Sequence, residues 1–157
     1  MPSKRNELRP HYTLRQLARM CRSPKAAVRM KAVDAMQYQS DMPPPRGYFR
    51  LAAGLLDDRV SKIRWQSAIL LGDFLPTMHA EIWKLCLGRG ASSNEDVRAM
   101  VACVLLEHLF EHHFDRYFPL VAAKVRGGRN FEDTVSTCWR FRVPARKWRK
   151  MTRLLKR

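Results

Sequence analysis

The sequence predicts an all-α fold, an α-solenoid of about four stacked helix pairs followed by a basic C-terminal helix. Three observations lead to this prediction. Equivalent apolar residues recur along the chain at spacings of 35, 34 and 34 residues. Within each repeat, the apolar residues follow the 3.6-residue period of a helix. No stretch alternates between polar and apolar residues for long enough to indicate a strand.

The repeat is visible as columns of equivalent positions. The anchor column consists of Val28, Ile63, Val97 and Phe131. The column fourteen residues earlier holds Leu14, Phe49, Trp83 and Tyr117. The column eleven residues earlier holds Leu17, Ala52, Cys86 and Leu120. The column eight residues later holds Met36, Leu71, Leu105 and Trp139. Because every position is apolar, we expect these columns to form a core shared by neighbouring pairs.

The first unit covers about residues 13–40, and Arg22-Ser23-Pro24 separates its two predicted helices. A serine before a proline is typical of a helix start, since serine caps the helix and proline suits its first turn. The second unit covers about residues 46–76, with the break at Asp57-Asp58. Pro43-Pro44-Pro45 divides the two units, because prolines end helices.

The third unit covers about residues 79–113 and follows Pro76. Its second helix is predicted to begin at a capping box made by Ser92 and Glu95. The fourth unit, about residues 114–142, breaks at the glycine pair Gly127-Gly128. This pair is interpreted as the end of a helix.

Two prolines mark the last part of the chain. Pro119 lies inside the first predicted helix of the fourth unit and should kink it. Pro144 is placed to start a last helix within residues 143–157. Residues 1–12 precede the repeats as a basic N-terminal arm.

The second unit resembles a HEAT repeat. Residues 55–68 read Leu-Leu-Asp-Asp-Arg-Val-Ser-Lys-Ile-Arg-Trp-Gln-Ser-Ala. The apolar-arginine pair that opens the second helix recurs as Val28-Arg29, Ile63-Arg64 and Val97-Arg98. The resemblance covers about residues 13–142 and implies the HEAT-like stacking of helix pairs. It says little about activity, because many functions are built on such surfaces.

The resemblance also implies a ladder in which each repeated arginine pairs with an aspartate of a turn. This chain keeps that aspartate as Asp57 or Asp58, but has serine at the equivalent place in units 1 and 3. The fourth unit has Glu132 where the arginine should stand. We therefore do not expect a complete ladder.

Four cysteines are present, and their spacing matches no metal or redox motif. They are Cys21, Cys86, Cys103 and Cys138. We interpret them as small core residues in a reducing compartment. No apolar run approaches the length of a membrane span, and a cytoplasmic location is expected.

The formal net charge of +16 is concentrated at the two ends of the chain. Residues 1–31 carry nine Lys and Arg against one acid, and residues 134–157 carry nine against none. Residues 32–133 carry twelve bases and thirteen acids. Such asymmetry favours a polyanionic partner, and nucleic acid is the commonest one. The alternative is that each end is only a polar cap on the repeats.

The C-terminal segment gives the sharpest functional signal, because tryptophans stand among many bases. The candidate phosphate-binding or base-stacking residues here are Arg140, Arg142, Arg146, Lys147, Trp148, Arg149, Lys150 and Arg153. The pattern also suits an anionic membrane surface or an acidic partner. A docked capping helix is a further interpretation of Trp148, Met151 and Leu155, and it is compatible with a basic outer face.

Two other groups of bases are candidates for the same role. Arg15, Arg19 and Arg22 are spaced to line one face of a helix. Arg29, Arg64 and Arg98 step along the starts of successive second helices, and Trp65 is a candidate exposed aromatic residue beside them. A solvated face for the first group and a structural role for the second are the alternatives.

Catalytic signals are weak. His108 and His112 lie in a His-x-x-Glu-His pattern and are weak candidates for metal ligands. No cofactor motif is present in the sequence. The function expected is a non-enzymatic protein that binds DNA or RNA. The alternatives are a scaffold for an acidic protein and, less favoured, an enzyme similar to the alkylpurine DNA glycosylases, which use a similar helical stack.

Overall fold

The computed structural model describes residues 10–39 and 45–156, and all regular secondary structure in these ranges is helical. The helices, in chain order, are α1 (Leu14–Cys21), α2 (Ala26–Gln39), α3 (Arg46–Leu55), α4 (Ser61–Gly72), α5 (Leu75–Arg89), α6 (Glu95–Met100), the π-helix η1 (Val101–Leu106), α7 (Glu107–Val125), α8 (Arg129–Thr137) and α9 (Ala145–Leu155). The predicted all-α class is therefore confirmed. Within the described ranges, no helix has both the length and the apolar character needed to cross a membrane.

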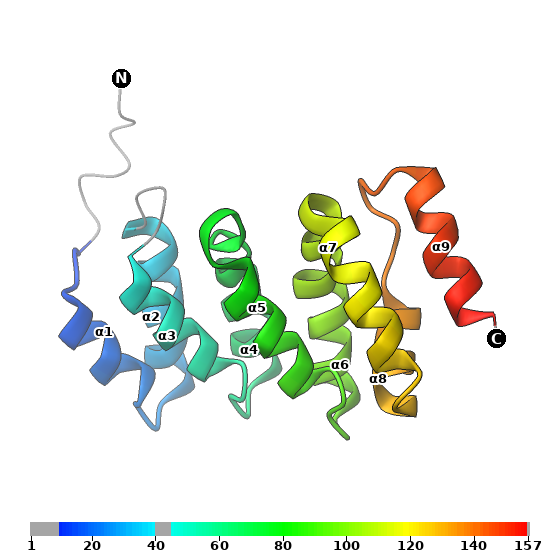
Figure 1. Ribbon diagram of the computed structural model, residues 1–157. Coiled ribbons are helices and arrows are strands. Elements are labelled where there is room, and N and C mark those ends of the chain that lie inside the picture. Colours follow the sequence, from blue (N-terminus) through cyan, green and yellow to red (C-terminus); the bar gives the residue numbers. More distant parts are fainter. Residues whose placement is uncertain (1–9, 40–44, 157) are drawn as a thin grey trace.

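The helices form two layers, and their pairs follow one another in a row that runs from α1 at one end to α9 at the other (Figure 1). Consecutive helices pack in pairs: α1 on α2, α3 on α4, α5 on η1, and α7 on α8. Each pair also contacts the next. Helix α2 packs on α4, α4 packs on α6 and η1, and both α6 and η1 pack on α8. The last helix, α9, packs on α7.

The chain passes from the second pair to the third, and from the third to the fourth, through two similar backbone breaks. Met78 (φ −129°, ψ 28°) interrupts α5, and His113 (φ −137°, ψ 33°) interrupts α7. Both lie at predicted unit boundaries. The expected kink at Pro119 is wrong, because α7 breaks at His113 and then continues through Pro119 to Val125. A proline clashes with the carbonyl four residues earlier, and that residue, Asp115, lies in the first turn after the break.

The helix caps agree only partly with the sequence prediction. The predicted box of Ser92 and Glu95 is wrong: Asn94 caps α6 and accepts hydrogen bonds from the amides of Asp96 (3.0 Å) and Val97 (3.4 Å). Asparagine is as strong a cap as serine, so the residue nearer the helix takes the role. Pro144 precedes α9, as predicted.

One continuous core runs through all the pairs and reaches Met151 and Leu154 of α9. Most members of the repeat columns lie in this core or pack against it, but three of them are exposed. Leu14 (48%) and Leu120 (46%) belong to the first and the last of the described pairs. Trp139 (75%) is exposed because α8 ends at Thr137, before the column position.

The four cysteines pack as predicted. Cys86 and Cys138 are buried, and Cys21 and Cys103 are half-buried against the core. Burial raises the pKa of all four thiols, which disfavours the reactive thiolate form.

Candidate anion-binding surface

Arg29 is part of the fold rather than of an open surface. Its guanidinium binds both carboxylate oxygens of Asp58 in the next pair, at 2.5 and 3.0 Å. It also donates to the backbone carbonyls of Ser23 (2.8 Å) and Pro24 (3.0 Å). Burial disfavours the charged Asp58 carboxylate, but the hydrogen bonds from Arg29 and from the Val60 amide outweigh this, and the pKa of Asp58 is lowered.

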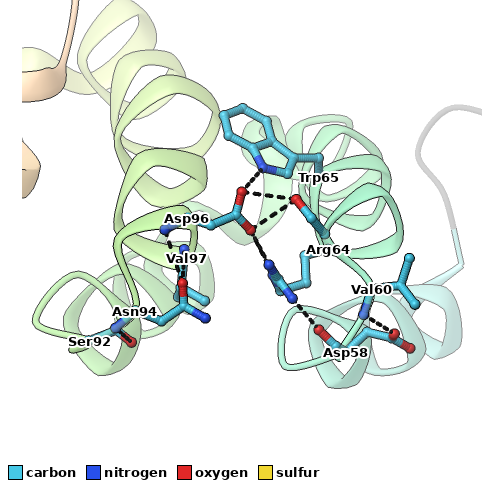
Figure 2. A network of polar contacts seen from close by, with 9 residues as sticks. Asp58, Val60, Arg64, Trp65, Ser92, Asn94, Asp96 and Val97 are labelled. Carbon is cyan, nitrogen blue, oxygen red and sulfur yellow. Dashed lines mark hydrogen bonds and ion pairs between the residues drawn. The ribbon is translucent and has the colours of Figure 1, made fainter.

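Arg64 makes the second rung of this ladder (Figure 2). It is buried and pairs with Asp96, while it also donates to the carbonyl of Asp58 at 2.6 Å. Trp65 donates its indole N–H to the same carboxylate at 3.0 Å, and Ser61 donates its hydroxyl at 2.9 Å. Burial opposes ionisation of Asp96, yet these hydrogen bonds lower its pKa.

The ladder is incomplete, as expected from the sequence, but it extends further than the motif predicts. It is present across the first three pairs, because Asp96, in the first turn of α6, replaces the missing turn aspartate of unit 3. In addition, the side chains of Arg29 and Arg64 are occupied within the fold, and Trp65 is half-buried and hydrogen-bonded. The guanidinium groups of Arg29 and Arg64 are therefore buried and engaged within the fold.

Arg98 is the third repeated arginine and is only half-buried. It donates to the carbonyls of Ser92 (2.8 Å) and Ser93 (3.2 Å), as Arg29 does to its own turn. Among the described residues, no carboxylate pairs with it. At the equivalent place the fourth pair is joined to the third by neutral hydrogen bonds, from Thr134 to the Gly90 carbonyl (2.6 Å) and from Asn130 to the Ala91 carbonyl (3.3 Å).

The N-terminal end of the row carries three exposed arginines. Arg15 and Arg19 lie on α1, and Arg22 caps its C-terminus. Their spacing places them on one side of the helix, as predicted, while Leu17 is buried on the other. The other bases of the predicted N-terminal arm, Lys4, Arg5 and Arg9, lie outside the described residues.

The C-terminal helix α9 has two sharply different faces. Its inner face buries Met151 and Leu154, with Trp148 half-buried beside them. Full burial of such side chains stabilises the docked helix by roughly 1.5–3 kcal/mol each. The outer face carries four exposed bases: Arg146, Arg149, Lys150 and Arg153. These positions are three or four residues apart and therefore lie on one stripe.

Two other predicted residues of α9, Lys147 and Trp148, make contacts within the fold. Lys147 is half-buried and donates to Asp115 of α7 at 2.6 Å. This hydrogen bond, with the charges of Lys147, Lys150 and Arg146, lowers the pKa of Asp115. Trp148 packs against the core and is not an exposed ring.

The connector between α8 and α9, residues 138–144, differs from what the repeat register predicts, which places Trp139 in the core. Arg140 and Arg142 are exposed as predicted, and Arg142 approaches Glu111 at 3.5 Å. Trp139 and Phe141 are also exposed, at 75% and 55%. One signal pointed to this: Val143 precedes a proline, which disfavours helix, so the preceding aromatic residues need not follow a helical period.

The histidine pattern on α7 forms no metal site in the described part of the chain. His108 places its Nδ1 atom 2.6 Å from the carbonyl of Val104, one turn earlier in the same stretch of helix. His112 is exposed and lies 3.8 Å from Glu111. No group of three potential ligands is found among the described residues.

Among the predicted site residues, the exposed bases thus lie on α1 and on α9 with its preceding connector, at the two ends of the row. Comparison with protein-family models, curated proteins and solved structures finds no match to this chain. The case for a function therefore depends on these residues.

Proposed function

We propose that the chain is a HEAT-like helical-repeat protein that binds nucleic acid, DNA or RNA, mainly through backbone phosphates. The HEAT-like interpretation is supported by the row of helix pairs and by the two ladder rungs of Arg29 and Arg64. These rungs join neighbouring pairs at equivalent positions of the repeat.

One observation carries the proposed function: the outer face of α9 presents four exposed bases on a helix whose other face is fixed to the core. Within the described residues, no acid forms an ion pair with Arg146, Arg149, Lys150 or Arg153. The charges are therefore held in place and remain open to a ligand. A helix that only closed the row would need polar residues on its outer face, not a stripe of four exposed bases.

Phosphate is the anion that this arrangement suits best. A stripe of bases on one helix face can follow successive phosphates of a strand, and each contact releases condensed counterions. Binding of this kind has little sequence specificity and weakens steeply with salt. The exposed arginines of α1 carry the same type of charge at the far end of the row.

The test is a fluorescence-anisotropy titration of labelled DNA and RNA strands at a series of salt concentrations. The variant replaces Arg146, Arg149, Lys150 and Arg153 with Gln, which keeps the helix propensity. If each base contacts one phosphate, the slope of log K against log salt should fall by about 3 for single strands. Lys147 is left unchanged because it pairs with Asp115.

A matched control removes four exposed bases from the body of the row. It replaces Arg46, Arg50, Lys62 and Lys84 with Gln, so that the net charge changes by the same amount. The control should keep the slope of the parent protein. An equal loss in both variants would mean that only the net charge matters, and absence of binding at low salt would refute the proposal.

A further inference from the structure

Trp139 leaves the core at the point where the repeat ends. Its three repeat equivalents, Met36, Leu71 and Leu105, are fully buried. Helix α8 stops at Thr137, the next residue, Cys138, is buried, and the indole of Trp139 is then 75% exposed. A tryptophan exposed to this degree is unusual, because most of its surface is apolar.

The backbone around this ring is held at several points. The amide of Trp139 donates to the buried carboxylate of Glu107 at 2.7 Å. The amide of Val143 donates to the Arg140 carbonyl at 2.9 Å, which closes a turn, and the side chain of Val143 is buried. The connector is therefore anchored on both sides of its exposed residues.

Phe141 lies in the middle of that turn with a φ of 42°, the one positive φ at a non-glycine residue in the described chain. This left-handed region is unfavourable for residues with a bulky side chain, and it persists only where the surroundings enforce it. Phe141 is nevertheless 55% exposed, and its ring contacts the half-buried ring of His108 (centroids 5.9 Å apart) rather than the buried core. Such strain is typical of positions kept for binding.

The surroundings of the two rings are basic. Arg140 and Arg142 flank Phe141, the guanidinium of Arg142 lies 5.7 Å from its ring centre, and α9 with its basic face follows directly. Aromatic rings beside a phosphate-binding surface stack on nucleic-acid bases. Base faces are accessible in a single strand and are hidden by stacking in a duplex.

From these observations we propose that Trp139 and Phe141 form a base-stacking platform, and that the chain binds single-stranded nucleic acid in preference to duplex. The inference rests on the proposed function and names its ligand class. Phosphates of the strand contact the outer face of α9, and one or two of its bases stack on the exposed rings.

The test compares binding of an oligo(dT) strand and a mixed-sequence duplex of equal length by anisotropy, using three variants. Trp139→Ala and Phe141→Gly each remove one ring. Glycine adopts the positive φ without strain, so Phe141→Gly should not lower the melting temperature. Ile69→Ala is the control, since it shortens an exposed apolar side chain (45%) on α4.

The parent protein should bind the single strand at least tenfold more tightly than the duplex. Each ring removal should weaken single-strand binding about tenfold, leave duplex binding within about twofold and leave the salt slope unchanged. Ile69→Ala should have no effect on either ligand.

Three results would overturn the platform. These are equal affinity for single strand and duplex, unchanged single-strand binding after both ring removals, and a large loss of melting temperature in Phe141→Gly, which would give the ring a packing role. If both ligands still bind with a salt slope that depends on the bases of α9, only the platform proposal fails. If neither ligand binds at low salt, the proposed function fails as well.

Discussion

Asp57 and Asp58 are adjacent in sequence but differ in environment, and this gives a sharp test of the ladder. Asp58 pairs with Arg29, and the side chains are 5% and 7% exposed. Asp57 pairs with Arg89 at 2.6 Å, but its side chain is 64% exposed. The perturbation is Asp58→Asn, and the control is Asp57→Asn.

The two substitutions should differ severalfold in cost. Removing one partner of a buried ion pair costs about 3–5 kcal/mol, because the other charge stays buried. Asparagine keeps one acceptor oxygen, so we expect the low end for Asp58→Asn, about 3 kcal/mol of unfolding free energy. Exposed pairs contribute about 0–1 kcal/mol, which is the range for Asp57→Asn.

Thermal and urea unfolding followed by circular dichroism at neutral pH measure both costs. For a chain of this size, the expected loss corresponds to a fall of roughly 6–12 °C for Asp58→Asn and at most about 4 °C for the control. A double-mutant cycle with Arg29→Met should show strong coupling to Asp58. Equal effects of the two substitutions would refute the buried-pair reasoning.

The pH dependence gives the same test a second readout. The pKa of Asp58 is lowered in the folded state, so the folded protein binds fewer protons than the unfolded chain as the pH falls below about 4. The stability that this carboxylate contributes is present above that pH and is lost as the pH falls through its folded pKa. The difference between the parent protein and Asp58→Asn should therefore be constant above about pH 5 and shrink in acid.

Two further predictions concern packing and a buried acid. Gly90→Ala should lower the unfolding free energy by about 1–3 kcal/mol, because its Cβ would lie 2.7 Å from both the Cys86 carbonyl oxygen and the Phe131 ring. Gly88 has open space around it, so Gly88→Ala should raise the unfolding free energy by about 0.5–1 kcal/mol, and urea unfolding measures both changes. Glu107→Gln should leave the unfolding free energy at pH 7 unchanged or higher. Burial raises the pKa of Glu107, so the parent protein loses stability as the pH rises through that pKa. A loss above about 1 kcal/mol of unfolding free energy in the variant would contradict this.

The helical class could be predicted because its signal is local and repeated. Anchors such as Ile63, Val97 and Phe131 recur at a nearly constant spacing and are all buried. The ladder could be predicted only in part. Asp96 comes four residues after the turn position that the motif specifies, and periodicity alone does not show that its carboxylate reaches Arg64.

The candidate site was harder to predict, because exposure depends on where a helix stops. The repeat register placed Trp139 in the core, but α8 ends two residues before it. Trp65 and Trp148 also stand beside bases in the sequence, yet Trp65 donates a hydrogen bond to Asp96 and Trp148 packs on the core. The composition predicts a basic end of the chain, but which aromatic rings are exposed there depends on the three-dimensional packing.

The charged rungs stop before the fourth pair, and this has a consequence for cooperativity. In an array where each unit is coupled only to its neighbours, the last unit opens first when its junction is weaker. Here that junction lacks a buried arginine–aspartate rung and has neutral hydrogen bonds such as Thr134 to Gly90 in its place, and α9 lies beyond it. Amides of α8 and α9 should therefore exchange with solvent sooner than those of α4. A strand bound there would slow that exchange, so occupancy and local order at this end would be thermodynamically linked.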